Sequence, residues 1–292
     1  MPLLLPAGRS VLTVAALLAV AVGAAAQTDA RRPPLYLAEQ GGTKVYLLGS
    51  VHVLPEGALP LPAHVEALFT AASVVAFEID LDAAAERAAD LFAAATDEAS
   101  VGDLLDDDQR AALYASMEGF GMPAQMLDPY EPWFAGMTYG MLSLKGDGSF
   151  GEGVDAYLFR RAGEAGKEIL ALETLADQIE AFDRLSDTGQ VAYLMDLVAT
   201  SAGAAAAFDE LVDAWGSGDD ARLSAVLAHE LGDGEVFESL LARRNRAWIP
   251  TIVALLNRPR DVSLVVVGAG HLVGPENVIA LLRAQGVKVR RL

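Results

Sequence analysis

The chain contains no cysteine among its 292 residues, so it has neither disulfides nor cysteine metal ligands. Basic residues are also scarce: 21 lysines and arginines stand against 40 acids, a formal net charge of −19. Such a charge repels phosphate backbones, and we predict no nucleic-acid partner. A glycine-rich phosphate loop is missing as well, because residues 268–270 (Gly-Ala-Gly) lack the third glycine of a dinucleotide fingerprint. These absences direct attention to the few histidines.

The N-terminal segment has the pattern of a secretory signal peptide. Arg9 precedes an apolar run over residues 11–22, and Ala24 and Ala26 fit the small-x-small cleavage rule. We therefore predict a signal peptide over residues 1–26 and a periplasmic or secreted mature protein. The apolar run is shorter than a membrane-spanning helix needs, so we expect no stable membrane anchor after cleavage. Residues 27–292 are predicted to form a single domain, whose oligomeric state the sequence does not indicate.

The pattern of apolar residues predicts an α/β (α+β) fold. Buried strands are expected at 44–48, 73–79 and 263–267, with shorter strands at 35–37, 167–172 and 287–291. Helix-period spacing dominates the stretch between about 82 and 256, in the segments 82–95, 107–118, 154–165, 176–185, 190–207 and 222–229. We therefore predict a central sheet built from N- and C-terminal strands, with a large helical insertion over about 82–256.

Two copies of the motif Gly-x-x-His follow two of these strands. Gly49 and His52 come after the strand at 44–48, and Gly268 and His271 end the strand at 263–267. Ligand sites of α/β proteins lie beyond the carboxyl ends of the strands, so both histidines are predicted to lie at a site. The alternative is that each histidine only caps its strand by a hydrogen bond.

Acidic residues also follow a buried strand, at Glu78 and Asp80. A buried carboxylate is costly unless it is hydrogen-bonded, paired or bound to a metal. His52, Glu78 and His271 together would supply three ligands for a divalent ion that activates water. Without a metal, Glu78 would be a general base and a histidine the general acid. In the alternative interpretation, Glu78 is a salt-bridged acid without a catalytic role.

A basic cluster, Arg243-Arg244-Asn245-Arg246, stands out in this acidic chain. Guanidinium groups bind carboxylates in a bidentate manner and stabilise oxyanions. The cluster is therefore predicted to hold a substrate carboxylate or an oxyanion, and the alternative is a solvated cluster paired with nearby acids.

These motifs, in this order, resemble the TraB/PrgY/GumN family, and in particular its bacterial GumN-like branch. The resemblance extends from about Leu35 to the C-terminus, and it is carried by the segments 48–55, 75–80, 153–158, 172–174, 244–248 and 267–272. The family has two Gly-x-x-His motifs, a glutamate and an arginine. The matching positions here are Gly49, His52, Gly268, His271, Glu78 and Arg244. The acid usual before the family's Arg-Asn pair is replaced here by Arg243.

The resemblance implies a fold shared with erythromycin-esterase-like and haem-binding ChaN-like proteins. It also implies chemistry, because animal relatives are metal-dependent proteases of secreted signalling proteins, supported by manganese or cobalt. We therefore predict an exported, metal-dependent hydrolase of peptides or proteins, using manganese, cobalt or zinc. The alternatives are a non-catalytic peptide-binding protein and a haem or metal carrier.

The predicted site residues have separate roles. His52, Glu78 and His271 bind the metal or activate water, Arg244 stabilises the oxyanion or holds substrate, and Asn245 supports it. Asp80, Asp155 and Glu173 are expected to contact these residues and to hold them in position, without binding the metal or the substrate themselves.

Overall fold

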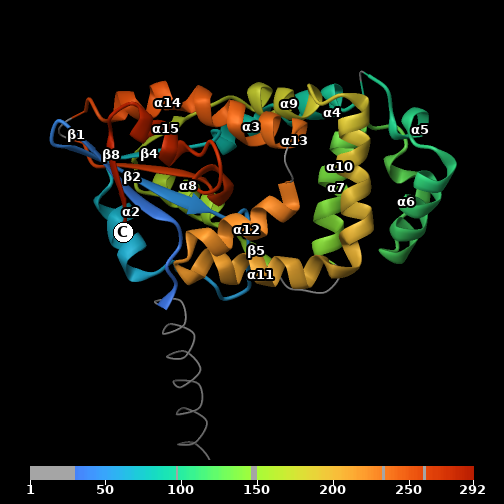
Figure 1. Ribbon diagram of the computed structural model, residues 1–292, viewed down its shortest axis with the longest axis horizontal. Coiled ribbons are helices and arrows are strands. Elements are labelled where there is room, and N and C mark those ends of the chain that lie inside the picture. Colours follow the sequence, from blue (N-terminus) through green and yellow to red (C-terminus); the bar gives the residue numbers. More distant parts are fainter. Residues whose placement is uncertain (1–29, 97, 146–149, 232–233, 259–260) are drawn as a thin grey trace, which may run out of the picture.

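The computed structural model describes residues 30–96, 98–145, 150–231, 234–258 and 261–292 (Figure 1). The predicted signal peptide over residues 1–26, with its cleavage site, lies outside the described residues. The family-like motifs all lie inside them.

The centre of the protein is a six-stranded mixed sheet. In spatial order its strands are β6 (Glu168–Ala171), β4 (Val74–Phe77), β7 (Ser263–Gly268), β2 (Thr43–Ser50), β1 (Leu35–Gln40) and β8 (Lys288–Arg291). The first four are parallel, while β1 is antiparallel to both β2 and β8. The prediction of a mixed α/β fold with strands from both ends of the chain is confirmed, and β6 joins them from within the helical block.

The register of the parallel strands brings their carboxyl ends to one edge of the sheet. Phe77 of β4 and Leu48 of β2 both pair with Val266 of β7, and Ala171 of β6 pairs with Phe77. The residues that follow these strands therefore emerge side by side. These residues include Glu78, His52, Glu173 and, after β7, His271.

Helices cover both faces of the sheet, which explains why its strands are almost wholly apolar. Alternate residues of β7 face opposite layers: Leu264 and Val266 pack in one buried cluster, and Val265 and Val267 in the other. The first layer contains α2 (Ala63–Ala71), α8 (Val154–Glu164), α11 (Ala204–Ser217) and α12 (Asp220–Leu231). The second contains α14 (Arg243–Leu255) and α15 (Val278–Ala284).

The remaining helices extend away from the sheet, with α5, α6, α7 and α10 at the far end in Figure 1. Their cores are separate from those of the sheet and include Leu113, Met117, Tyr139 and Leu194 in one cluster and Trp133 in another. The elements are α3 (Leu81–Glu86), α4 (Ala88–Ala94), α5 (Val101–Leu104), α6 (Asp107–Gly119), α7 (Pro132–Lys145), α9 (Leu175–Asp183), α10 (Asp187–Thr200) and α13 (Glu235–Phe237). Shorter pieces are η1 (Ala124–Leu127), η2 (Ser201–Gly203), η3 (Glu238–Ala242), η4 (Ala269–His271) and the two-stranded sheet of β3 (Val53–Pro55) and β5 (Phe150–Glu152).

Two predicted helices are divided in the structure. The segment 82–95 is broken at Arg87 into α3 and α4, and the segment 190–207 is broken at η2 into the end of α10 and the start of α11. Both breaks lie in alanine-rich sequence, where apolar spacing continues through the junction and the period alone does not mark the end of a helix.

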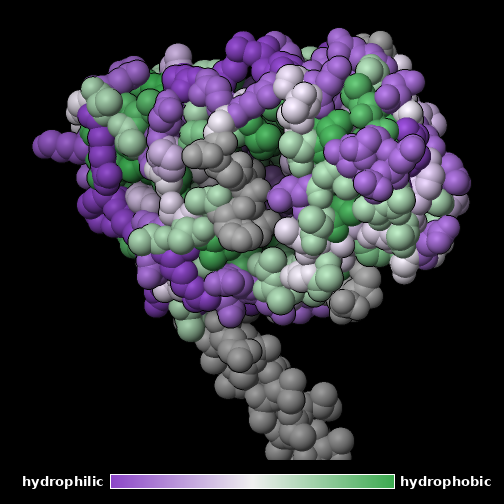
Figure 2. Space-filling model, turned by 45° about the vertical axis from the view of Figure 1, so that its right-hand side comes forward, coloured by the Kyte–Doolittle hydropathy of each residue, from purple (hydrophilic) through white to green (hydrophobic). Residues whose placement is uncertain are grey.

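The helical run Asp187–Ser217 is long and apolar enough to cross a membrane by length and composition. Here it consists of α10, η2 and α11, and its side chains Leu194, Phe208 and Trp215 are buried in the hydrophobic core. In the view of Figure 2, hydrophilic side chains cover much of the surface, with smaller apolar areas between them. In this fold, 17% of the apolar window of the run is buried.

Candidate active site

Glu78 lies directly after β4 and is held as a buried carboxylate. Its Oε1 atom accepts a hydrogen bond from the Gly268 amide at 2.6 Å, and its Oε2 atom accepts one from Arg244 Nη2 at 2.6 Å. The side chain is 11% exposed. Burial by itself raises the pKa of this carboxyl. The facing His271 and Arg244 groups outweigh that effect, and the pKa is lowered from 4.5 to about 2. Glu78 is therefore ionised at neutral pH.

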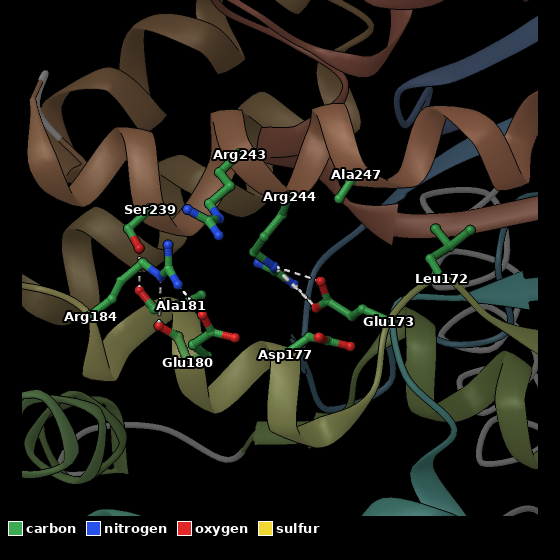
Figure 3. Close-up of a pocket in the computed structure, with 10 residues that line it drawn as sticks. All are labelled: Leu172, Glu173, Asp177, Glu180, Ala181, Arg184, Ser239, Arg243, Arg244 and Ala247. Atoms are coloured by element: carbon green, nitrogen blue, oxygen red, sulfur yellow. Dashed lines mark hydrogen bonds and ion pairs between the residues drawn. The ribbon is translucent and has the colours of Figure 1, made fainter.

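Arg244 joins Glu78 to a second carboxylate, Glu173, which follows β6. Arg244 donates from Nε to both Glu173 oxygens at 3.1 Å and from Nη2 to Oε1 at 2.6 Å, as drawn in Figure 3. Burial raises the pKa of Glu173, and the hydrogen bonds from Arg244 oppose that rise. One guanidinium thus pairs with two neighbouring acids and weakens the repulsion between them.

Local backbone geometry fixes the position of Arg244. The π-helical turn η3 leads directly into α14, and π turns often mark functional sites because they shift the side chains that follow. Arg244 Nη1 donates to the Leu240 carbonyl of that turn at 2.9 Å. The guanidinium is therefore tied to its own helix as well as to the two carboxylates.

His271 is buried behind Arg244, and its tautomer is set by Asn245. Asn245 Nδ2 donates to the Glu276 carbonyl at 3.0 Å, which turns its Oδ1 atom toward His271 Nδ1 at 2.6 Å. Nδ1 therefore carries the proton and Nε2 is the acceptor, 3.3 Å from Arg244 Nη1 and 3.7 Å from Glu78 Oε1. Burial lowers the pKa of His271 to about 3, so this imidazole is neutral at neutral pH.

His52 has the opposite character, although it follows the same motif. Its side chain is 69% exposed, and its Nδ1 atom lies 3.1 Å from Asp155 Oδ1 at the start of α8. The hydrogen bond with Asp155 raises the pKa of His52 to about 9. The charge on His52 in turn lowers the pKa of His271, so the two rings are near enough to interact. His52 is a protonated, outward-facing group with Nε2 free to donate.

The motif glycines are required by close backbone approaches. A Cβ atom on Gly268 would lie 3.2 Å from Glu78 Oε1, and one on Gly49 would lie 3.0 Å from the Pro34 side chain. Trp215 Nε1 also donates to the Gly49 carbonyl at 2.8 Å. A third glycine, Gly153, has the least room: its Cβ would be 2.1 Å from the His52 carbonyl oxygen.

The structure brings most of the predicted site residues together. Glu78, Glu173, Arg244, Asn245 and His271 form one hydrogen-bonded cluster, and His52 with Asp155 forms a pair beside it. Asp80 is not in the cluster. Its Oδ1 atom accepts from the amides of residues 82 and 83, both at 3.0 Å, and so caps the N-terminus of α3.

Trp248 is a site residue to which the sequence patterns assigned no role. Its Nε1 atom donates to Glu173 Oε2 at 2.9 Å, its ring centroid lies 4.3 Å from that of His271, and Arg244 Cζ lies 4.9 Å from the centroid of its ring. The signal was present, because Trp248 lies four residues after Arg244, the spacing of one helix face. It could be used only once the segment had been recognised as a helix.

The predicted metal ligands do not form a metal site in this arrangement. Both histidines hold Nδ1 against an oxygen acceptor, as metal-binding histidines do, although Nε2 of His271 faces Arg244 Nη1 at 3.3 Å. However, Arg244 takes the cation's place between Glu78 and His271. In the part of the chain that the structure describes, no three histidine or acidic side chains are close enough to hold one ion.

The fold and this cluster define a mixed α/β protein with a buried, charged site at the carboxyl edge of its parallel strands. The chain matches the model of the TraB/PrgY/gumN family over residues 34–291, and it belongs to that family. It is also similar to a protein of Amphimedon queenslandica described as a metalloprotease TIKI homolog, with 30% identity over 164 residues. That alignment covers 48% of this chain and 32% of the relative, so the matched part spans about a third of the relative's length. No solved structure gives a significant match.

Proposed function

We propose that this protein is a hydrolase that cleaves peptide bonds at the Glu78–Arg244 site. One observation carries the proposal: an ionised carboxylate, a neutral imidazole and a guanidinium meet at the carboxyl edge of the sheet, beside an exposed protonated histidine. The metalloprotease description of the Amphimedon queenslandica relative supports the same reaction class. The proposed substrate is a peptide or protein.

The charges of the four groups suit hydrolysis of an amide. Glu78 accepts a proton from water as the water oxygen attacks the carbonyl carbon, and Arg244 donates hydrogen bonds to the oxyanion that forms. His52, protonated because of Asp155, donates a proton to the leaving amine as the C–N bond breaks. The proton held by Glu78 then returns to His52, which restores the starting state.

Arg244 also controls the basicity of Glu78. A carboxylate whose pKa is about 2 is a weak base, and part of that low pKa comes from the Arg244 charge. When Arg244 turns its hydrogen bonds toward a substrate oxygen, Glu78 loses stabilisation of its charge and becomes a stronger base. Glu173 and Leu240 keep the guanidinium in place during this exchange.

A dependence on a divalent metal is supported by the word metalloprotease in the name of the relative and by the donor types of His52, Glu78 and His271, and manganese, cobalt and zinc are the ions proposed. The present arrangement does not hold such an ion, and no step above is assigned to one. Export to the periplasm or the medium is proposed on the basis of the signal-like sequence over residues 1–26.

The test is hydrolysis of a peptide library by the chelated protein and by protein reloaded with each metal, compared with Glu78→Gln. Glutamine keeps the shape of the side chain, so loss of cleavage with an unchanged circular dichroism spectrum supports the proposal. Equal turnover by Glu78→Gln would refute it. Saturable peptide binding without cleavage under every metal condition would support the non-catalytic peptide-binding alternative instead.

A further inference from the structure

A cavity of about 230 Å³ lies beside the Glu173–Arg244 pair. Figure 3 shows its two walls: α9 contributes Asp177 and Glu180, Arg184 follows directly after that helix, and η3 and α14 face them from the other side. Glu173 and Arg244 belong to the cavity lining, and Arg244 also contacts Glu78 at 2.6 Å. The cavity therefore adjoins the proposed reacting groups through a single side chain.

The acids that line the cavity are already engaged. Glu173 accepts hydrogen bonds from Arg244 and Trp248, and Glu180 is paired with Arg184. Asp177 Oδ2 accepts from the Thr174 amide at 2.8 Å and from its hydroxyl at 2.7 Å, which closes the capping box of α9. These carboxylates thus have partners without a further cation.

Arg243 is the third arginine that lines the cavity, beside the paired Arg184 and Arg244. Its side chain projects from α14 toward the cavity in Figure 3, near that of Arg184. Within the described ranges, the Arg243 guanidinium has no hydrogen-bond or ion-pair partner. Arg246, three residues further along the same helix, provides the contrast, because it pairs with Glu276 at 2.7 Å and with Glu238.

We propose that this cavity is a subsite for one carboxylate group of the substrate, with Arg243 as its guanidinium partner. A guanidinium presents paired N–H donors that match the two oxygens of a carboxylate. The volume suits one acidic side chain or a chain terminus rather than a larger ligand. The net charge of −19 disfavours polyanions, so the ligand is a peptide with one carboxylate in this position.

This inference rests on the proposed hydrolase function for its choice of ligand. A carboxylate bound in the cavity places the adjoining peptide next to Arg244, the residue assigned to the oxyanion. The site thereby selects peptides with an acidic residue or a free C-terminus close to the bond that is cut. The binding itself does not require turnover, so it is measured separately.

The test is calorimetric binding of N-acetylglutamate α-methylamide, which carries a single carboxylate, and of its uncharged analogue, N-acetylglutamine α-methylamide, to the full chain. Arg243→Gln is the test variant and Arg246→Gln the matched control, both at exposed positions of α14. We expect N-acetylglutamate α-methylamide to bind about tenfold more weakly to Arg243→Gln, equally well to Arg246→Gln, and about tenfold more tightly than N-acetylglutamine α-methylamide to the wild type. Absence of saturable binding, equal binding of the two probes, or equal loss in both variants would overturn the subsite.

Cleavage of paired peptides that differ only by Glu or Gln near the scissile bond separates the two proposals. Hydrolysis without a preference for glutamate refutes the subsite and leaves the hydrolase standing. Binding of N-acetylglutamate α-methylamide that depends on Arg243, without cleavage of any peptide, supports the subsite and refutes the hydrolase. A glutamate preference that Arg243→Gln abolishes, while cleavage of the glutamine peptide continues, supports both.

Discussion

Replacing Arg244 by methionine tests the electrostatic description of the site most directly. The change removes the guanidinium between Glu78 and Glu173, whose side chains are 11% and 6% exposed. Methionine keeps apolar packing against Trp248, so the loss is mainly one of charge and hydrogen bonding. Removing one partner of a buried ion pair costs about 3–5 kcal/mol of unfolding free energy. For a domain of this size, that corresponds to a melting temperature about 6–20 °C lower.

The pH dependence of that loss has a definite sign. The folded-state pKa of Glu78 is about 2, and its ordinary value is 4.5. A depressed folded-state pKa contributes stability that is fully present above about pH 4.5 and is lost as the pH falls toward 2. At roughly 1.4 kcal/mol per pKa unit, the contribution is about 3 kcal/mol. The variant lacks much of it, so the stability difference between wild type and Arg244→Met is largest at pH 7 and shrinks below pH 4.5.

The measurement is urea unfolding, followed by tryptophan fluorescence, of chelated wild type and Arg244→Met at pH 7, 4 and 3. Arg246→Met is the control, because its ion pairs are at the surface and their loss costs less than about 1 kcal/mol. An Arg244→Met variant within about 1 kcal/mol of wild type at pH 7 would refute the reasoning. So would a difference that stays constant as the pH is lowered.

Three further predictions concern the surroundings of the cluster. Asp155→Ala removes the hydrogen-bond partner of His52, so the His52 pKa should fall from about 9 toward 6.5 in an NMR titration of metal-free protein; an unchanged value would assign the shift to other charges. Gly153→Ala places a Cβ 2.1 Å from the His52 carbonyl oxygen and should cost more than about 2 kcal/mol in thermal unfolding, which an unchanged melting temperature would contradict. Arg244→Gln frees Glu78 and His271 from their competing cation, so calorimetric affinity for manganese or zinc should rise about tenfold or more; affinity equal to wild type would show that Arg244 does not compete.

Much of the sheet could be predicted from the chain because its signals are local. A buried parallel strand is a short apolar run, and the strands β2, β4 and β7 all begin or end within a few residues of their predicted limits. The helical region was less predictable in detail. Alanine-rich sequence carries the helix period across breaks such as η2, and the π-helical turn before α14 has no comparable pattern.

The predicted site residues were found from their strand ends and from family motifs, but their partners were not. Arg244 and Glu78 are separated by 166 positions, and the hydrogen bond between them exists only because α14 packs over the carboxyl edge of the sheet. The same packing brings Trp248 against Glu173 and His271, and it places Arg243 in the cavity lining without a partner among the described residues. No spacing within a short window encodes such contacts.

The sequence by itself determined an acidic α/β chain with a helical insertion and with histidines and a glutamate at the ends of parallel strands. Only the tertiary structure decided the charge state of each of those residues. His52 and His271 have the same local motif, yet one is exposed beside Asp155 with a raised pKa, and the other is buried behind Arg244 with a lowered one. The physical reason is that a pKa depends on solvent access and neighbouring charges, which here come from residues 26 to 219 positions away along the chain.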